Sequence, residues 1–146
     1  MVSELITIYE RDINRLKIEI ESFQTEENLW KITGQVKNTA GNLGLHLVGN
    51  LKTYIGKNLG GYDYTRDREA EFNLKNVPKE QLLQQIDETK QVVVLALQQL
   101  EKTQLEEIYL EETLGYPMTT GFFLIHLAAH LSYHLGQINY LRRILE

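Results

Sequence analysis

Hydrophobic residues recur at helical spacing along four segments of the chain. The segments run approximately over residues 3–21, 39–57, 78–102 and 120–145. In the first, the hydrophobic side chains follow in steps of three or four, at Leu5, Tyr9, Ile13, Leu16 and Ile20. Such steps place them on one face of an α-helix, so the pattern predicts four long amphipathic helices.

The ends of these segments carry residues that favour helix boundaries. Pro78 opens the third segment, and proline is favoured in the first turn of a helix. The hydroxyls of Thr119 and Thr120 are suited to cap the fourth segment. The second segment ends before the Gly60-Gly61 pair, which favours a turn.

Two substantial connections separate the predicted helices. Residues 58–77 are long and polar, and a connection of that length in a compact domain is usually functional or well packed. Residues 104–118 contain the alternating Ile108 and Leu110, which allow a short extended piece. We find no repeat or domain boundary, so residues 1–146 are interpreted as a single domain. Its predicted fold is all-α, a four-helix bundle with at least one crossover connection.

Composition restricts the chemistry and the partners. The chain is 42% hydrophobic and 24% charged, as in an ordinary soluble protein. The absence of cysteine excludes disulfides, thiolate ligands and a cysteine nucleophile, and it fits a reducing cytoplasm. The net charge of −5 disfavours binding to phosphate backbones, and no apolar run reaches the roughly 18 residues needed to span a bilayer. We therefore expect a cytoplasmic protein with neither nucleic-acid nor membrane partners.

All four histidines fall on two of the predicted helices. His126, His130 and His134 recur every four residues, and each such step turns a helix by only about 40°. Imidazoles with this spacing can bind one metal ion from the same side. The helical wheel places His134 in the apolar face, His130 at its border and His126 furthest out, which favours His130 and His134 as a pair. Hydrogen-bonded packing in the core is the alternative.

A third histidine ligand has to come from the second helix, where His46 is the only histidine. Its direction is not settled by the wheel, because the leucines of this helix centre to one side of it. Polar side chains form a stripe at steps of four: Asn42, His46, Asn50 and Tyr54. Three glycines flank the stripe: Gly41, Gly44 and Gly49. Glycine costs a helix interior about 1 kcal/mol relative to alanine, so the cluster indicates either close approach of a neighbour, room beside a site, or loose packing.

Other metal architectures lack their motifs in this chain. A ferritin-like di-iron site needs Glu-x-x-His, but the residue three positions before each histidine is hydrophobic. A zincin needs His-Glu-x-x-His, but a leucine follows every histidine. Haem ligation is disfavoured because His130 and His134 share one helix face. What remains is a mononuclear three-histidine site with open positions for water or substrate.

The segment His130-Leu-Ser-Tyr-His134-Leu-Gly-Gln-Ile138 is similar to the last-helix signature of the DinB-like superfamily. The block Asn42-Leu-Gly-Leu-His46-Leu-Val-Gly-Asn50, with Gly60-Gly61 and Arg66-Asp-Arg-Glu-Ala-Glu-Phe72 after it, resembles a poorly characterised bacterial branch of that superfamily. The match runs in order from the second helix to the end of the chain. The resemblance implies a bundle of up-down-down-up connectivity with a long crossover, often a homodimer.

The resemblance also implies one divalent metal ion (nickel, zinc, iron or manganese) held by one histidine of the second helix and two of the fourth. Carried over to this sequence, these ligands are His46, His130 and His134. His126 has no counterpart in the signature and is interpreted as structural or as a neighbour of the ligands.

Characterised members of the superfamily include metal-dependent transferases that use low-molecular-weight thiols such as bacillithiol, mycothiol or glutathione, together with some hydrolases and isomerases. The resemblance therefore implies a metal-dependent thiol S-transferase or hydrolase that acts on a small-molecule substrate. The alternative is a non-catalytic, metal-stabilised bundle that serves as a binding or stress-response module. No residue of the chain is a convincing general base, and this keeps the alternative open.

Five residues are candidates to orient ligands or substrate. Asn50 lies one turn from His46, and Tyr133 and Gln137 flank His134, although ordinary helix-surface roles are the alternative for each. Arg66 and Arg68 are candidates to shape the cleft from the long connection, and a solvated, self-paired run of charges is the alternative.

The two acidic residues that accompany these arginines are interpreted differently. Asp67 and Glu71 stand in a run of alternating charges, which is typical of a solvated, self-paired surface. We therefore expect neither carboxylate to belong to the site.

Overall fold

The computed structural model describes residues 1–146, and its regular elements are helical. Four long helices form the bundle: α1 (Val2–Ser22), α2 (Ala40–Leu51), α5 (Lys79–Gln98) and α6 (Thr120–Leu145). Shorter elements join them: η1 (Glu26–Trp30), η2 (Lys52–Lys57), α3 (Asn58–Gly60), α4 (Arg68–Asn73) and η3 (Lys102–Glu106). The predicted all-α four-helix bundle is confirmed.

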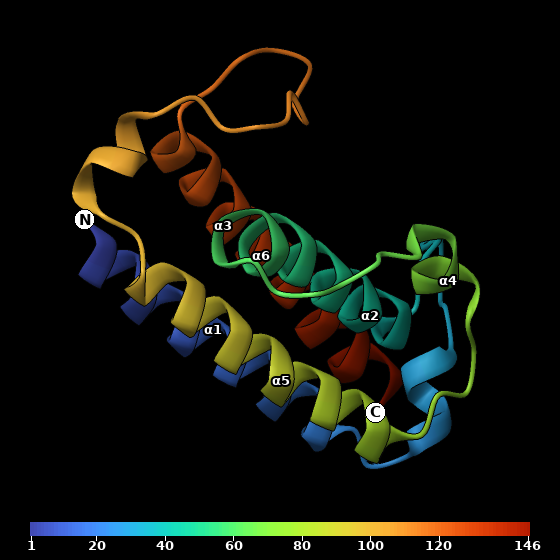
Figure 1. The fold of residues 1–146 in the computed structure, drawn as a ribbon. Helices are drawn as coiled ribbons and strands as arrows, with labels where there is room; N and C mark the ends of the chain where they lie inside the picture. Colours follow the sequence, from blue (N-terminus) through green and yellow to red (C-terminus); the bar gives the residue numbers. More distant parts are fainter.

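The chain direction gives the up-down-down-up connectivity that the resemblance implied. Helices α1 and α6 run in one direction, and α2 and α5 run in the opposite direction (Figure 1). Because α2 and α5 are parallel, residues 61–78 return along the length of the bundle as a crossover. Elements η2 and α3 prolong α2 to Gly60, beyond the predicted end, and Gly61 then takes a left-handed φ of 69°.

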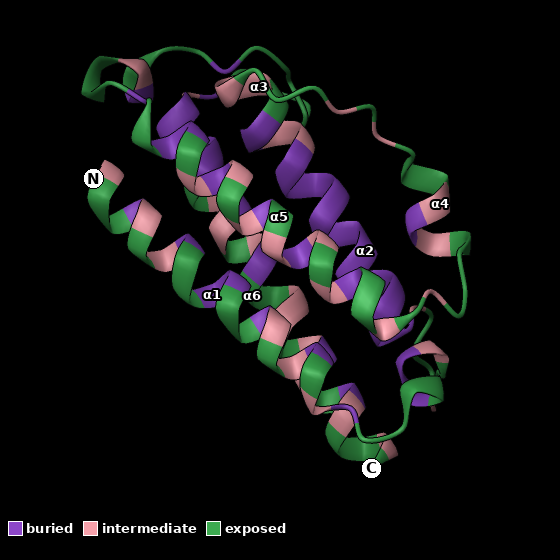
Figure 2. Ribbon diagram, turned by 60° about the horizontal axis from the view of Figure 1, so that its bottom comes forward, coloured by how far each residue is buried: buried purple, intermediate pink, exposed green.

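Helix α2 is buried on every side, unlike its neighbours. All twelve residues of α2 are buried, whereas α1 and α5 each expose one face to solvent (Figure 2). The sequence pattern predicted an amphipathic helix, and this is wrong because α4 of the crossover and η1 pack on the face of α2 that the bundle leaves open. The glycines of α2 permit this packing: a Cβ at Gly41 would lie 2.7 Å from the Trp30 ring. Close approach accounts for Gly41 and for Gly49, whereas a Cβ at Gly44 would make only ordinary contacts, the nearest at 3.5 Å.

The connections differ from the sequence expectation in three places. Residues 23–39 form a further substantial connection, which contains η1. The long crossover contains α4, which begins where the Asp67 side chain accepts a hydrogen bond of 3.1 Å from the Ala70 backbone N–H. The connection before α6 has no strand, only an isolated bridge between Ile108 and Thr119. No helix combines the length and the hydrophobicity needed to cross a bilayer.

Candidate metal centre

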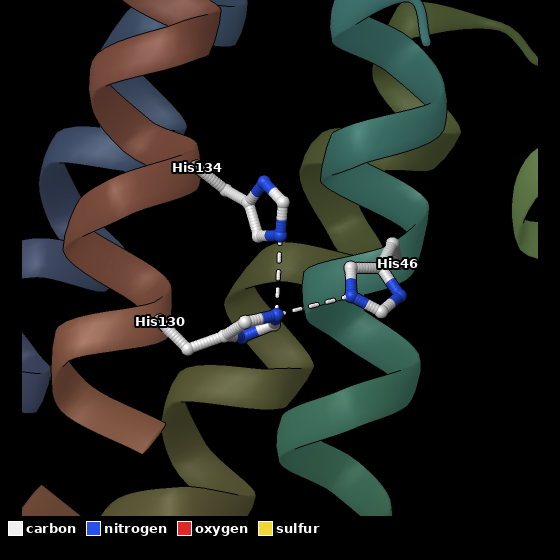
Figure 3. A group of neighbouring side chains, drawn as sticks. All are labelled: His46, His130 and His134. Atoms are coloured by element: carbon white, nitrogen blue, oxygen red, sulfur yellow. Dashed lines mark hydrogen bonds between the residues drawn. The ribbon is translucent and has the colours of Figure 1, made fainter. Parts of the chain in front are cut away.

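Three histidines from α2 and α6 point toward one another in the space between these two helices (Figure 3). The Nε2 atom of His130 lies 3.2 Å from Nε2 of His46 and 3.1 Å from Nε2 of His134. One nitrogen from each ring lies within 4.8 Å of the other two. His130 and His134 come from consecutive turns of α6, and His46 faces them from α2. The structure therefore brings together the three residues that the sequence and the resemblance selected.

Side-chain caps start the two helices that carry the histidines. The Thr39 hydroxyl accepts a 3.1 Å hydrogen bond from the Asn42 N–H at the start of α2, and the Thr119 hydroxyl accepts a 3.2 Å bond from the Phe122 N–H at the start of α6. His46 is buried, whereas His130 and His134 are each half-buried. The wheel placed His134 deeper in the apolar face than the structure does, since α6 turns its histidines toward α2 and not toward the centre of the core.

His46 is held in place by a buried ion pair from the crossover. Its Nδ1 lies 3.0 Å from Oε1 of Glu71, and this carboxylate accepts from Nε of Arg66 at 2.8 Å and from Nη2 at 2.9 Å. Glu71 is only 5% exposed. Its interpretation as a solvated surface charge is therefore wrong, although the pairing within the run is real. Asp67 is exposed, as expected, and caps α4.

Docking of α4 on α2 explains why Glu71 is buried. The side-chain amide of Asn42 donates to the backbone carbonyls of Glu71 at 2.9 Å and Leu74 at 2.8 Å, which ties α4 to α2. The Glu71 carboxylate then lies over Gly49, where a Cβ would overlap it. Gly49, one turn after His46, was the sequence signal that a group approaches this helix face, but it could not identify which group.

The electrostatics keep Glu71 charged. Burial by itself would raise the pKa of Glu71, but hydrogen bonds from His46 and Arg66 outweigh burial and lower this pKa. An ionised carboxylate only accepts hydrogen bonds, so the proton of a neutral His46 ring lies on Nδ1. The Nε2 lone pair of His46 is then directed toward His130 and His134.

The two ligand histidines of α6, His130 and His134, are kept neutral by burial. The side-chain oxygen of Gln137 lies 2.7 Å from Nδ1 of His134 and accepts a hydrogen bond from its N–H, which leaves the lone pair of this ring on Nε2. Burial lowers the pKa of His134 although the Gln137 hydrogen bond opposes this effect. Burial, with the neighbouring His134 and His46, lowers the pKa of His130 to about 4. Both imidazoles are thus available as neutral ligands near neutral pH.

The donor set fits a divalent metal ion. Nε2 of His130 faces the Nε2 lone pairs of His46 and His134 and can donate a hydrogen bond to only one of them. Hydrogen bonds among the three rings therefore cannot satisfy all three nitrogens. Nδ1 of His130 is buried without a hydrogen-bond partner. A cation accepts all three lone pairs at once. Bonds of roughly 2.0–2.1 Å to a tetrahedral ion separate ligand nitrogens by roughly 3.3 Å. The two separations that involve His130, 3.1 and 3.2 Å, are close to this value, and that between His46 and His134 is at most 4.8 Å.

A cavity of about 190 Å³ lies beside the histidines. Three of the candidate residues line it, namely Asn50, Arg66 and Arg68, together with His46, His126 and His130. Asn50 is 6% exposed, and its Oδ1 has no hydrogen-bond partner. The His126 ring stacks on Phe123 at 6.0 Å between centroids, so this fourth histidine borders the cavity without joining the group of three.

The two remaining candidates lie on other sides of His134. Gln137 contacts the His134 ring and also lines a second, larger cavity of about 480 Å³ with Leu43 and Leu141. Tyr133 is 65% exposed on the outer face of α6, with its ring 5.3 Å from the His134 ring. Tyr133 therefore does not line the cavity beside the three histidines.

The chain is similar to a protein family and to a solved structure. Residues 9–146 match the family described as protein of unknown function (DUF1572). The chain belongs to this family. No curated protein sequence matches it. Among solved structures, this DUF1572 chain is similar to a DinB-like protein from Bacillus cereus ATCC 10987, with a TM-score of 0.70 and 20% identity over 92% of this chain and 85% of that one. This likeness confirms the DinB-like fold that the sequence resemblance indicated.

Proposed function

We propose that this DUF1572 chain binds one divalent metal ion through His46, His130 and His134 and acts as a metal-dependent enzyme. The observation that carries this proposal is the convergence of three imidazole nitrogens, with the opposite nitrogen hydrogen-bonded to Glu71 in His46 and to Gln137 in His134. Nickel, zinc, iron and manganese are the candidate ions, and imidazole suits the first three best. Three protein ligands leave positions open for water or substrate.

The proposed reaction is thiol transfer to, or hydrolysis of, a small-molecule substrate. The ion would supply Lewis acidity, which lowers the pKa of a thiol or a water molecule and makes it a nucleophile at neutral pH. Since the chain has no cysteine, the thiol would be a low-molecular-weight cosubstrate. Glu71 and Gln137 orient the rings, and Asn50, Arg66 and Arg68 border the cavity where the substrate would lie. A cytoplasmic location, where such thiols stay reduced, is part of this proposal.

Elemental analysis of protein purified without a metal-binding tag tests the metal site. We expect about one ion per chain in the wild type and its loss in the His130→Ala variant. His126→Ala is the matched control, because this residue lies one turn away on the same helix and outside the group of three. No metal in the wild type after reconstitution with nickel, zinc, iron and manganese would refute the proposal.

A second candidate function is a metal-stabilised binding module without turnover. The observation that favours it is the lack of a free general base, since no carboxylate lines the cavity and Glu71 is committed to His46 and Arg66. Screening the metal-loaded protein against electrophiles with several low-molecular-weight thiols, and against hydrolysable esters and amides, separates the two functions. Turnover that disappears in His130→Ala supports the enzyme, and its absence supports the module.

We also propose that the chain forms a homodimer through α6. This helix is apolar on its outer face too, where five large side chains are about half or more exposed: Phe122, Ile125, Tyr133, Tyr140 and Ile144. A helix that is hydrophobic all round is usually buried. Light scattering after size exclusion should give a dimer that Ile125→Lys dissociates. Ile18→Lys on α1 is the control, since Ile18 is 57% exposed and Ile125 is 52% exposed. A monomeric wild type would contradict the proposal.

A further inference from the structure

The cavity beside the three histidines is positively charged, although the chain as a whole is acidic. Arg66 and Arg68 line this cavity, and none of its lining residues carries a carboxylate. The whole chain has 20 acidic and 15 basic side chains and a net charge of −5. The cavity therefore departs from the general surface of the protein in the sign of its charge.

The two arginines differ in how far their charge is compensated. Arg66 is neutralised by its paired contacts with Glu71. Arg68 has no carboxylate within ion-pair distance, and its guanidinium stacks 5.5 Å from the centre of the Phe72 ring, which holds it near the cavity. One uncompensated positive charge thus borders the cavity before any metal binds. A divalent ion on neutral imidazoles would add two more.

Asn50 supplies an independent sign that a hydrogen-bond donor, either a hydroxyl of a ligand or an ordered water molecule, belongs beside this cavity. Its side chain is 6% exposed, lines the cavity and leaves Oδ1 without a partner. A buried polar group without a partner costs about 1–3 kcal/mol, so such a residue is normally paired by a ligand or an ordered water molecule. Tyr54 and Thr113, whose hydroxyl groups can donate hydrogen bonds, line the same cavity.

We propose that this cavity binds the oxyanionic group, a carboxylate or a phosphate, of a small substrate, with Arg68 and Asn50 as its contacts. A planar guanidinium donates to two oxygens of such a group, and Nδ2 of Asn50 can donate to an oxygen as well. Oδ1 of Asn50 then accepts from a hydroxyl or a water molecule that accompanies the anion. The volume of about 190 Å³ holds about six water molecules at roughly 30 Å³ each, so the group is small or is the acidic end of a longer molecule. As a substrate class this inference rests on the proposed function, but Arg68 and Asn50 bind the anion without the metal.

Calorimetric titration of acetate, inorganic phosphate and neutral acetamide tests the site at low ionic strength. Metal-free and zinc-loaded protein are both titrated, and the zinc content of each sample is measured. We expect acetate or phosphate to bind and acetamide not to bind; the better anion identifies the substrate as a carboxylate or a phosphate. Arg68→Gln should weaken anion binding about tenfold or more in both forms, since it removes a charge-assisted contact. Asn50→Asp, which keeps the size and adds a negative charge, should abolish binding.

The control variant is Arg143→Gln, which removes the same charge from an exposed site near the end of α6. It should bind the anion as the wild type does. Equal weakening by the Arg68 and Arg143 variants would reduce the effect to net charge and overturn the inference. Binding that needs zinc and ignores Arg68 would assign the anion to the metal alone and overturn it too. A zinc-loaded protein that binds no anion refutes this site but not the metal proposal. Arg68-dependent anion binding in a protein that takes up no metal supports this site and refutes the metal proposal.

Discussion

The two helices that meet at the histidines hold their ligands in different ways. On α2, His46 is buried and contacts Glu71, a charged residue 25 positions along the chain that is itself held by Arg66. On α6, His134 is half-buried and contacts Gln137, a neutral residue three positions along the same helix. The support of His46 on α2 depends on tertiary docking of the crossover, whereas the support of His134 on α6 comes from the same helix.

This difference predicts unequal contributions to metal binding. A carboxylate that accepts the second N–H of a ligating imidazole raises the basicity of the ring and fixes its tautomer. A neutral amide fixes the tautomer with a weaker hydrogen bond, because bonds that involve a charged partner are roughly twice as strong. Glu71 should therefore contribute more to metal affinity than Gln137 does, although it lies further along the chain from the histidine that it supports.

The largest effect is expected for Glu71→Gln. This substitution keeps the shape of the side chain but removes the charge that holds the proton on Nδ1 of His46, and it leaves Arg66 unpaired. Zinc affinity should fall by about 10–100-fold, the usual cost of losing such a partner. Competition with a chromophoric chelator measures this affinity.

Two further variants test whether the position of the carboxylate is what matters. Gly49→Ala should also weaken zinc binding, because its methyl group would overlap the Glu71 carboxylate and displace it from His46 without changing its charge. Glu69→Gln is the matched control, since it removes the same charge from an exposed position of α4 and should leave the affinity unchanged. Wild-type affinity in Glu71→Gln would contradict the role given to this carboxylate.

A smaller effect is expected for Gln137→Met on the α6 side. Methionine keeps the length of the side chain and removes the acceptor for His134 Nδ1, but His134 is only half-buried, so water can replace the lost hydrogen bond. We expect zinc affinity to fall by less than about tenfold, below the range for losing a charged partner. The same chelator competition compares the two variants directly. A loss as large as that of Glu71→Gln would remove the asymmetry between the two sides.

The sequence predicted the parts of this molecule that depend on local periodicity. Four helices follow from hydrophobic steps of three and four, and the step from His130 to His134 places two ligands on one face of α6. The crossover was predicted as a long polar connection because polar side chains and glycines break the pattern after residue 57. These features are set within one or two helical turns, which is the range over which a pattern along the chain carries information.

The missed features depend on contacts between distant segments. Glu71 looked like a surface charge because its neighbours in the chain are charged, but docking of α4 on α2 buries it against His46. The wheel could not orient His46 for the same reason, since α2 has no solvent-facing side from which an inward direction can be inferred. In the sequence, this docking is indicated by Gly49, which leaves space for a neighbour, and by Asn42 of the polar stripe, but neither residue identifies Glu71.

The smallest predicted effect is the loss of folding stability in the metal-free protein as the pH falls. The contribution of the histidines on α6 should be lost first. The folded pKa of His130, about 4, and that of His134 lie below the unfolded value of about 6.5, so the unfolded chain binds protons more readily. Stability that is fully present above about pH 6.5 is therefore lost as the pH falls toward about 4. The pKa of Glu71 is also lowered, from 4.5, so the contribution of this carboxylate to stability is lost only in stronger acid.

Thermal unfolding in the presence of a chelator, at about pH 7.5 and about pH 5, measures this loss. The melting temperature should be lower at about pH 5 than at about pH 7.5, because the unfolded histidines take up protons between these two pH values. Both pH values lie above the range in which Glu71 takes up a proton. His130→Met removes the more strongly shifted group and should make the fall shallower, whereas Glu71→Gln should leave its size unchanged. Equal falls in the wild type and His130→Met would show that burial of this imidazole on α6 does not couple protonation to folding.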